Sequence, residues 1–176
     1  MSHDLFSSFA SIDSSNSSVL LVRDVAGDYR QVDADEVLQA AQEVLLARVR
    51  GGDVLASPQA VRDFLRVKLG TLAHEMFAVV HLDSQNRVID YVEMFRGTVS
   101  QTSVYPREVV RESMMRNSAA LLLVHNHPSG STQPSKADEM LTQTLKTALA
   151  LVDVRVLDHL IVAGNDILSM AERGLM

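Results

Sequence analysis

The chain has 176 residues, 47% of them hydrophobic and 22% charged, which is typical of a globular domain with a sizeable core. Its formal net charge of −6 argues against broad electrostatic capture of nucleic acid, and the absence of cysteine excludes disulfides and thiolate metal ligands. No apolar run approaches the roughly 18 residues of a membrane span, and no secretion-signal pattern is present at the N-terminus, so we expect a cytoplasmic protein.

The N-terminal third is predicted to hold a tail and a small appendage. Residues 1–18 are rich in serine and lack periodicity, which predicts a flexible tail. Residues 19–56 are predicted to form a hairpin and a helix, with short strands at 19–23 and 29–32 and helical apolar spacing over 33–50. We expect this appendage to pack on the main domain or on a partner chain.

The main domain is predicted to occupy residues 57–176. Helices are expected where apolar residues recur at helical spacing, at 57–69, from 106 onward and at 135–151. Strands are expected where apolar runs lie between turn residues, at 74–83, 87–97, 119–124 and 154–163, with a further extended piece at 98–104 and a short ending after 166. Strands and helices mix without strict βαβ alternation, which predicts an α+β (mixed α/β) fold with one sheet covered by helices.

The segment 125–138, HNHPSGSTQPSKAD, carries the clearest chemical signal. His125 and His127 are two residues apart at the end of the apolar strand, so both side chains point to one side if the extended geometry persists. Asp138 follows a short loop, in the first turn of the next predicted helix. Two imidazoles and one carboxylate that converge in this way make the ligand set of a catalytic zinc site, which keeps its fourth position for water.

Less specific interpretations apply to the same residues. Ser135 and Asp138, followed by an apolar run, also resemble a capping box, in which Ser135 is the helix N-cap. A lone buried histidine is more often a hydrogen-bonded core residue than a metal ligand. The capping and metal-binding interpretations are compatible, because Ser135 can cap the helix while Asp138 binds a metal ion.

The spacing His125-x-His127-Pro128, then Ser135 and Asp138, resembles the signature of the JAMM (MPN+) metalloprotease-like domains. The longer pattern HNHPSG…PS..D, with Asp158-His159 downstream, is similar to the RadC-like branch of that family. This resemblance covers residues from about 57 to the C-terminus and implies a central mixed β-sheet flanked by helices. It also implies that His125, His127 and Asp138 are zinc ligands, and that Ser135 steadies the oxyanion or the water.

Glu75 is the candidate general acid/base, as a carboxylate within an otherwise apolar strand. From the strand pattern alone it is equally well explained as an edge or surface residue. The resemblance implies a catalytic role, because JAMM domains place their catalytic glutamate on an early strand ahead of the histidine motif. Asp158 is a candidate for the carboxylate that orients a metal-bound imidazole through its other N–H.

The leading hypothesis is therefore a zinc metallopeptidase of the JAMM type, a hydrolase that cleaves a peptide or isopeptide bond in an unidentified protein substrate. Two other classes remain open at this stage. One is a DNA-repair-associated or DNA-binding protein of the RadC-like type, which the acidic charge balance disfavours. The other is a metal-binding interaction module without turnover, which would have no need of a base such as Glu75.

Overall fold

The computed structural model describes residues 20–23, 26–50, 58–97 and 103–176. The predicted flexible tail at 1–18 and the predicted boundary between the appendage and the main domain at 56–57 both lie outside these residues. The chain divides into two compact units, with the division between Leu38 and Gln39.

The first unit contains a two-stranded antiparallel hairpin, as the sequence predicted. Strand β1 (Leu20–Arg23) pairs with β2 (Tyr29–Val32), with Leu20 opposite Val32. Helix α1 (Ala34–Arg50) follows at once. Its first turn is held by reciprocal hydrogen bonds, because the Glu36 N–H donates to Asp33 Oδ1 (2.8 Å) and the Asp33 N–H donates to Glu36 Oε2 (3.2 Å).

The second unit is built on a five-stranded mixed sheet in the order β4-β3-β5-β6-β7. Its strands are β3 (Met76–Leu82), β4 (Val88–Arg96), β5 (Ala120–Asn126), β6 (Arg155–Ala163) and β7 (Asp166–Ser169). Strand β3 is antiparallel to β4 and β5, β5 is parallel to β6, and β7 returns antiparallel to β6. The predicted α+β fold with a central mixed sheet is thus confirmed.

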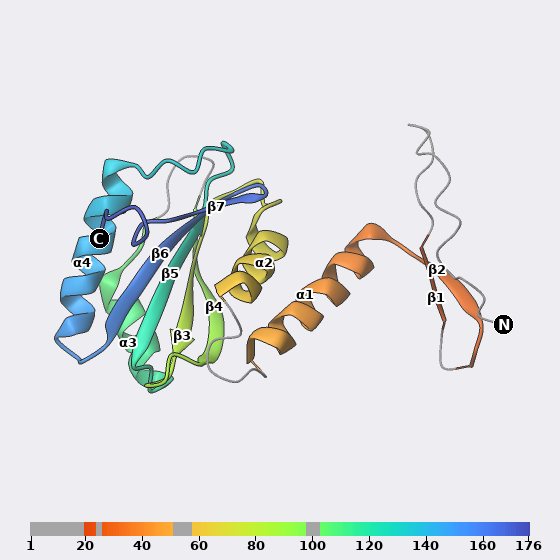
Figure 1. Ribbon diagram of the computed structural model, residues 1–176, viewed down its shortest axis with the longest axis horizontal. Coiled ribbons are helices and arrows are strands. Elements are labelled where there is room, and N and C mark those ends of the chain that lie inside the picture. Colours follow the sequence, from red (N-terminus) through yellow and green to blue (C-terminus); the bar gives the residue numbers. More distant parts are fainter. Residues whose placement is uncertain (1–19, 24–25, 51–57, 98–102) are drawn as a thin grey trace. The chain divides into compact units, whose positions relative to one another are not determined.

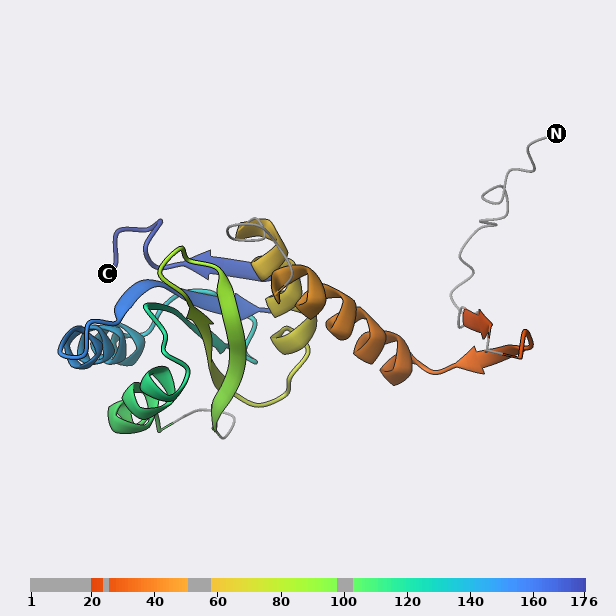
Figure 2. The ribbon, with the colours of Figure 1, turned by 90° about the horizontal axis from the view of Figure 1, so that it is seen from below.

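Helices cover both faces of this sheet. Helices α3 (Pro106–Met115) and α4 (Lys136–Ala150) lie on one face, and α2 (Pro58–Leu69) lies on the other (Figures 1 and 2). Each face has its own apolar core. Phe77, Leu121 and Leu123 pack toward Leu145 of α4, whereas Ala78, Val80 and Val124 pack toward Phe64 of α2. Strand β3 lies between two strands and two helical layers, so all seven of its residues are buried.

Three details differ from the expectations. The ending after residue 166 contains a strand, β7, which pairs with β6 through Leu160 and Ser169. The extended piece expected at 98–104 lies mostly outside the described residues, and residues 103–105 are not in a strand. Strand β3 begins at Met76, so Glu75 immediately precedes it.

No helix in the described parts of the chain is long and apolar enough to cross a bilayer.

Candidate metal centre

Strand β5 delivers the two histidines of the motif to one side of the sheet. His125 lies in the strand, opposite Phe77 of β3 and Ile161 of β6. His127 lies just past the strand, but its N–H still donates to the Val162 carbonyl of β6 (2.8 Å). The extended geometry therefore continues through His127, and the predicted same-side placement of the two rings is confirmed.

The beginning of α4 supplies the carboxylate. Ser135 is the N-cap of this helix: its Oγ accepts from the Asp138 N–H (3.2 Å), and its N–H donates to Asp138 Oδ2 (2.7 Å). The Ser135 hydroxyl also lies 2.6 Å from Asp138 Oδ2, to which it donates. The capping box is thus present, and it holds the Asp138 carboxylate at the end of the helix that faces the histidines.

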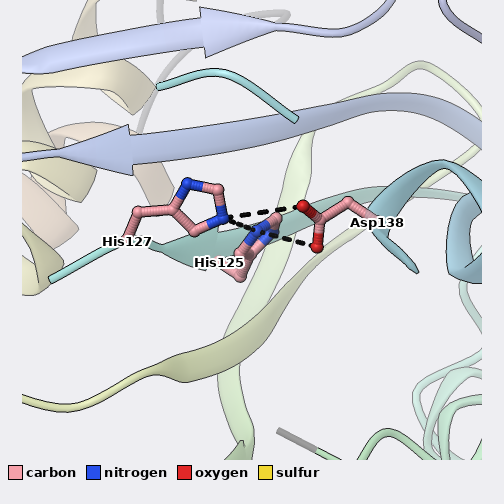
Figure 3. A group of neighbouring side chains, drawn as sticks. All are labelled: His125, His127 and Asp138. Carbon is pink, nitrogen blue, oxygen red and sulfur yellow. Dashed lines mark hydrogen bonds and ion pairs between the residues drawn. The ribbon is translucent and has the colours of Figure 1, made fainter. Parts of the chain in front are cut away.

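The three side chains point toward one another from β5, from the residue after it and from α4 (Figure 3). His125 Nε2 and His127 Nε2 are 2.8 Å apart, and they lie 3.3 Å and 3.6 Å from the two oxygens of Asp138. One potential ligand atom from each residue lies within 4.8 Å of the other two, an arrangement that can hold a metal ion. The side chains are 8%, 13% and 16% exposed, so the cluster is largely desolvated yet still reachable from solvent.

A hydrogen bond to Nδ1 of His127, on the side of the ring away from the cluster, determines that Nε2 faces the cluster as an acceptor. Its Nδ1 lies 2.7 Å from the Ser131 carbonyl oxygen, which can only accept, so Nδ1 carries a proton. Nε2 of a neutral His127 therefore presents a lone pair to the cluster. This is the orientation that a metal-bound imidazole adopts when a carbonyl holds its other nitrogen.

Burial and charge act in opposite directions on these groups. Burial lowers the pKa of His125 to about 4, so its ring is neutral at physiological pH. The hydrogen bond to Asp138 outweighs burial at His127 and raises its pKa, to which the Glu75 carboxylate also contributes. Burial disfavours ionisation of Asp138, but the two histidines and Ser135 lower the pKa of this carboxyl well below its usual range. The neighbouring carboxylates thus favour the charged form of His127, whereas burial favours the neutral form of His125.

The structure places Glu75 near enough to the cluster for its charge to act on His127. It precedes β3, on the side of the strand that Phe77 and Val79 share, which is the face covered by α3 and α4. Its carbonyl accepts from the Gly97 N–H (2.8 Å), which ties it to the end of β4. The side chain is partly buried, and its charge acts on His127. Ser135, the other predicted catalytic residue, is also adjacent, with its hydroxyl bonded to Asp138.

Asn126 faces away from the two histidines that flank it, as extended geometry requires. The residue is 2% exposed, and its side chain binds the backbone where β3 begins. Oδ1 accepts from the Met76 N–H (2.8 Å), and Nδ2 donates to the His74 carbonyl (3.0 Å). The strand pattern alone did not reveal this contact, because it joins residues fifty positions apart.

His159, not Asp158, contacts the histidine cluster, so the expectation for Asp158 was wrong. The pairing of β5 with β6 shifts by one residue at Leu157, so that Leu121 pairs with Val156 but Leu122 pairs with Asp158. This bulge turns Asp158 to the α2 face, where its carboxylate accepts from the Ser169 hydroxyl (2.5 Å) and the Ala171 N–H (3.0 Å). His159 takes the opposite face, with its Nε2 2.8 Å from Nδ1 of His125.

Residues 55–175 match the family described as RadC-like JAB domain. The chain belongs to this family. The resemblance drawn from the histidine motif is therefore confirmed, and the five-stranded mixed sheet with its helices is consistent with the JAB/MPN fold.

Relatives of this RadC-like JAB domain carry the name UPF0758 protein. The protein of Leptothrix cholodnii is 54% identical over 150 residues, which are 85% of this chain and 68% of the relative. The protein of Acidovorax sp. is 56% identical over 150 residues, again 85% of this chain but 63% of the relative. The protein of Aromatoleum aromaticum is 54% identical over 149 residues, 84% of this chain and 65% of the relative. The chain thus spans about two thirds of the length of these relatives.

Proposed function

We propose that this RadC-like JAB domain is a zinc-dependent hydrolase that cleaves a peptide or isopeptide bond, with Glu75 as its general acid/base. The observation that carries the proposal is the convergence of two imidazole nitrogens and a carboxylate within 4.8 Å, beside a second carboxylate whose charge reaches the same cluster. A module that only bound metal would not need this additional carboxylate.

The donor set fits zinc better than it fits calcium or magnesium. Zinc binds imidazole nitrogen and carboxylate oxygen, and its catalytic sites use three protein ligands with a fourth position left open. Calcium and magnesium take oxygen ligands, which two imidazoles do not provide. The rigid supports of the three groups, a strand shared with two neighbours and a capped helix terminus, favour one fixed geometry.

The reaction divides between the ion and the side chains. A bound zinc ion lowers the pKa of a water molecule to near neutrality and polarises a carbonyl. Glu75 would take the proton of this water and deliver it to the leaving amine, which completes hydrolysis of the amide. Ser135 keeps Asp138 in place through its N–H and hydroxyl. Its predicted hydrogen bond to the oxyanion or the water would require the hydroxyl to leave Asp138 during the reaction.

A substitution at Glu75 tests this proposal, because it separates chemistry from binding. Glu75→Gln retains the size of the side chain but cannot accept the proton, so turnover should fall on the order of 10²–10⁴-fold while zinc content and melting temperature stay unchanged. The assay follows hydrolysis of a panel of peptides and isopeptide-linked ubiquitin-like proteins. Glu139→Gln, an exposed glutamate in the same first turn of α4 as Asp138, is the matched control and should retain activity.

Three results would contradict the proposal in different ways. Equal turnover in the wild-type chain and Glu75→Gln would remove Glu75 from the chemistry. Loss of zinc from Glu75→Gln would make this residue a ligand instead of a base. A zinc-loaded wild-type chain that cleaves no member of the panel would favour a metal-binding module without turnover.

A further inference from the structure

A row of buried polar groups runs away from the metal centre on the side opposite to solvent. His125 Nδ1 lies 2.8 Å from His159 Nε2, and His159 Nδ1 lies 2.6 Å from Thr142 Oγ1. Thr142 Oγ1 in turn lies 2.6 Å from the Asp138 carbonyl oxygen, one turn earlier in α4. Thr142 and His159 are both fully buried, so these contacts are shielded from bulk solvent. The row starts at one candidate ligand, His125, and ends on the backbone of another, Asp138.

The Asp138 carbonyl sets the direction of the first hydrogen bond. A carbonyl oxygen can only accept, and two oxygens 2.6 Å apart need a proton between them, so the Thr142 hydroxyl donates to Asp138. The alternative acceptor near this hydroxyl is Met170 Sδ, a weak acceptor at 3.8 Å. Since the hydroxyl has one hydrogen, Thr142 Oγ1 must act as the acceptor toward His159.

The direction of this hydrogen bond determines which nitrogen is protonated in the rings of His159 and His125. His159 Nδ1 carries the proton that it donates to Thr142, so Nε2 of the neutral His159 ring has a lone pair. That lone pair accepts from His125, which places the single ring proton of His125 on Nδ1. Nε2 of His125 is left unprotonated, and it is the atom that faces His127 and Asp138.

We propose that Thr142 and His159 are positioning residues that fix the tautomer of His125, so that its Nε2 presents a lone pair to the metal ion. The inference rests on the metal site of the proposed function. The carbonyl of one ligand residue, Asp138, thereby determines the protonation of another, His125, through two side chains that do not touch the ion. The carbonyl of Ser131 does the same for His127 directly.

Removal of the Thr142 hydroxyl should reverse the whole row. In Thr142→Val, the proton on His159 Nδ1 loses its acceptor in a buried position. The proton is then better placed on Nε2, where His125 Nδ1 can accept it. The proton of His125 moves to Nε2, with Asp138 Oδ1 3.3 Å away as acceptor. This places a proton on the nitrogen that must bind metal, although every candidate ligand is unchanged.

The test uses the full chain with ¹⁵N-labelled histidine, first without metal. Long-range ¹H–¹⁵N spectra distinguish a protonated Nδ1 from a protonated Nε2, and they should show the Nδ1–H form of His125 in the wild-type chain and the Nε2–H form in Thr142→Val. Zn²⁺ affinity, measured by competition with a chromophoric chelator, should be about 10–100-fold weaker in Thr142→Val, the usual effect of losing a group that orients a ligand.

Two further variants separate positioning from folding. Thr142→Ser retains the hydroxyl and should restore both the Nδ1–H form and the wild-type affinity. Thr147 lies on the exposed side of α4, and its hydroxyl also donates to a carbonyl one turn earlier. Thr147→Val should change neither the His125 tautomer nor the Zn²⁺ affinity. Melting temperatures of all variants exclude unfolding as the cause of a loss.

An Nε2–H form of His125 in the wild-type chain would overturn the inference. Unchanged tautomers and affinity in Thr142→Val would overturn it as well. The spectra need neither metal nor substrate, so they report on the ring protons even if the chain hydrolyses nothing. A failure to hydrolyse would contradict the proposed function alone.

Discussion

The side chain of Asn126 binds the backbone on both sides of Glu75. It accepts from the N–H of Met76 and donates to the carbonyl of His74, the two residues that flank the glutamate. Asn126 itself lies between the two candidate ligand histidines on the same stretch of chain. One segment therefore directs the imidazoles to one face of the sheet and, from its other face, fixes the position of the carboxylate that would act with them.

Asn126→Ala should separate these two effects. Loss of these two hydrogen bonds releases the Glu75 segment and leaves a buried N–H and a partly buried carbonyl without that partner. This should destabilise the fold on the order of 1–3 kcal/mol. Turnover should fall on the order of 10²-fold, because small displacements of a catalytic group have effects of that size. Zinc affinity should be retained. Asn165→Ala, on the exposed turn between β6 and β7, is the control. Loss of zinc together with activity would contradict this assignment.

Ser135→Ala tests what the N-cap does for the site. The substitution removes the cap and the hydroxyl that donates to Asp138 Oδ2, so we expect about 1 kcal/mol lower stability. Zinc affinity should fall about tenfold, because the carboxylate loses a group that orients it. Chemical unfolding and chelator competition measure the two effects, with Ser129→Ala on the motif loop as control. Turnover that falls while zinc affinity stays unchanged would instead support the predicted bond from Ser135 to the reacting oxygen.

His81 should make the fold sensitive to acid. It is fully buried, and its Nδ1 forms a hydrogen bond with the Ser118 hydroxyl (2.9 Å). Burial lowers the pKa of His81 to about 4. The charge of Arg116 lowers this pKa further, whereas the charges of Asp90 and Glu112 raise it. Between pH 6.5 and 4 the unfolded chain binds the proton that folded His81 does not, so stability falls as pH falls through this window.

The contribution of His81 at pH 4 should be on the order of 3 kcal/mol relative to pH 7, from its pKa difference. Urea unfolding of the metal-free chain as a function of pH measures it. His81→Gln, which does not titrate, should show a smaller loss over this window than the wild-type chain. The buried His125 and His159 have lowered pKa values too and should leave a residual slope of the same sign in the variant. Identical pH profiles would contradict the assignment to His81.

Local patterns were sufficient to predict most of the fold and the three candidate ligands. The spacing of His125 and His127 on an apolar strand, and the Ser135–Asp138 cap, are short-range features that the structure reproduces. The family resemblance directed attention to Glu75, which alternation alone placed equally well at a surface. The role of Asn126 was not predictable in this way, because its partners are set by the pairing of β5 with β3.

The choice between Asp158 and His159 shows most clearly what the sequence alone could not predict. Strict alternation along β6 cannot reveal a one-residue shift, and the bulge at Leu157 decides which of the two side chains faces the cluster. Thr142 carried no signal in the sequence, because a threonine on the buried side of a helix is ordinary. Its significance comes from its contact with His159, which is seventeen residues further along the chain.

The metal content of three variants tests the central claim most directly. After exposure to Zn²⁺ and dialysis, the wild-type chain should retain about one zinc ion, as a three-ligand site predicts. His127→Ala should retain essentially none, and Asp138→Asn should bind much more weakly, since an amide oxygen replaces an anionic ligand. Asp166→Asn, an exposed carboxylate at the start of β7, should match the wild-type chain. Full zinc occupancy in His127→Ala would contradict the account, because the ion would then be held elsewhere.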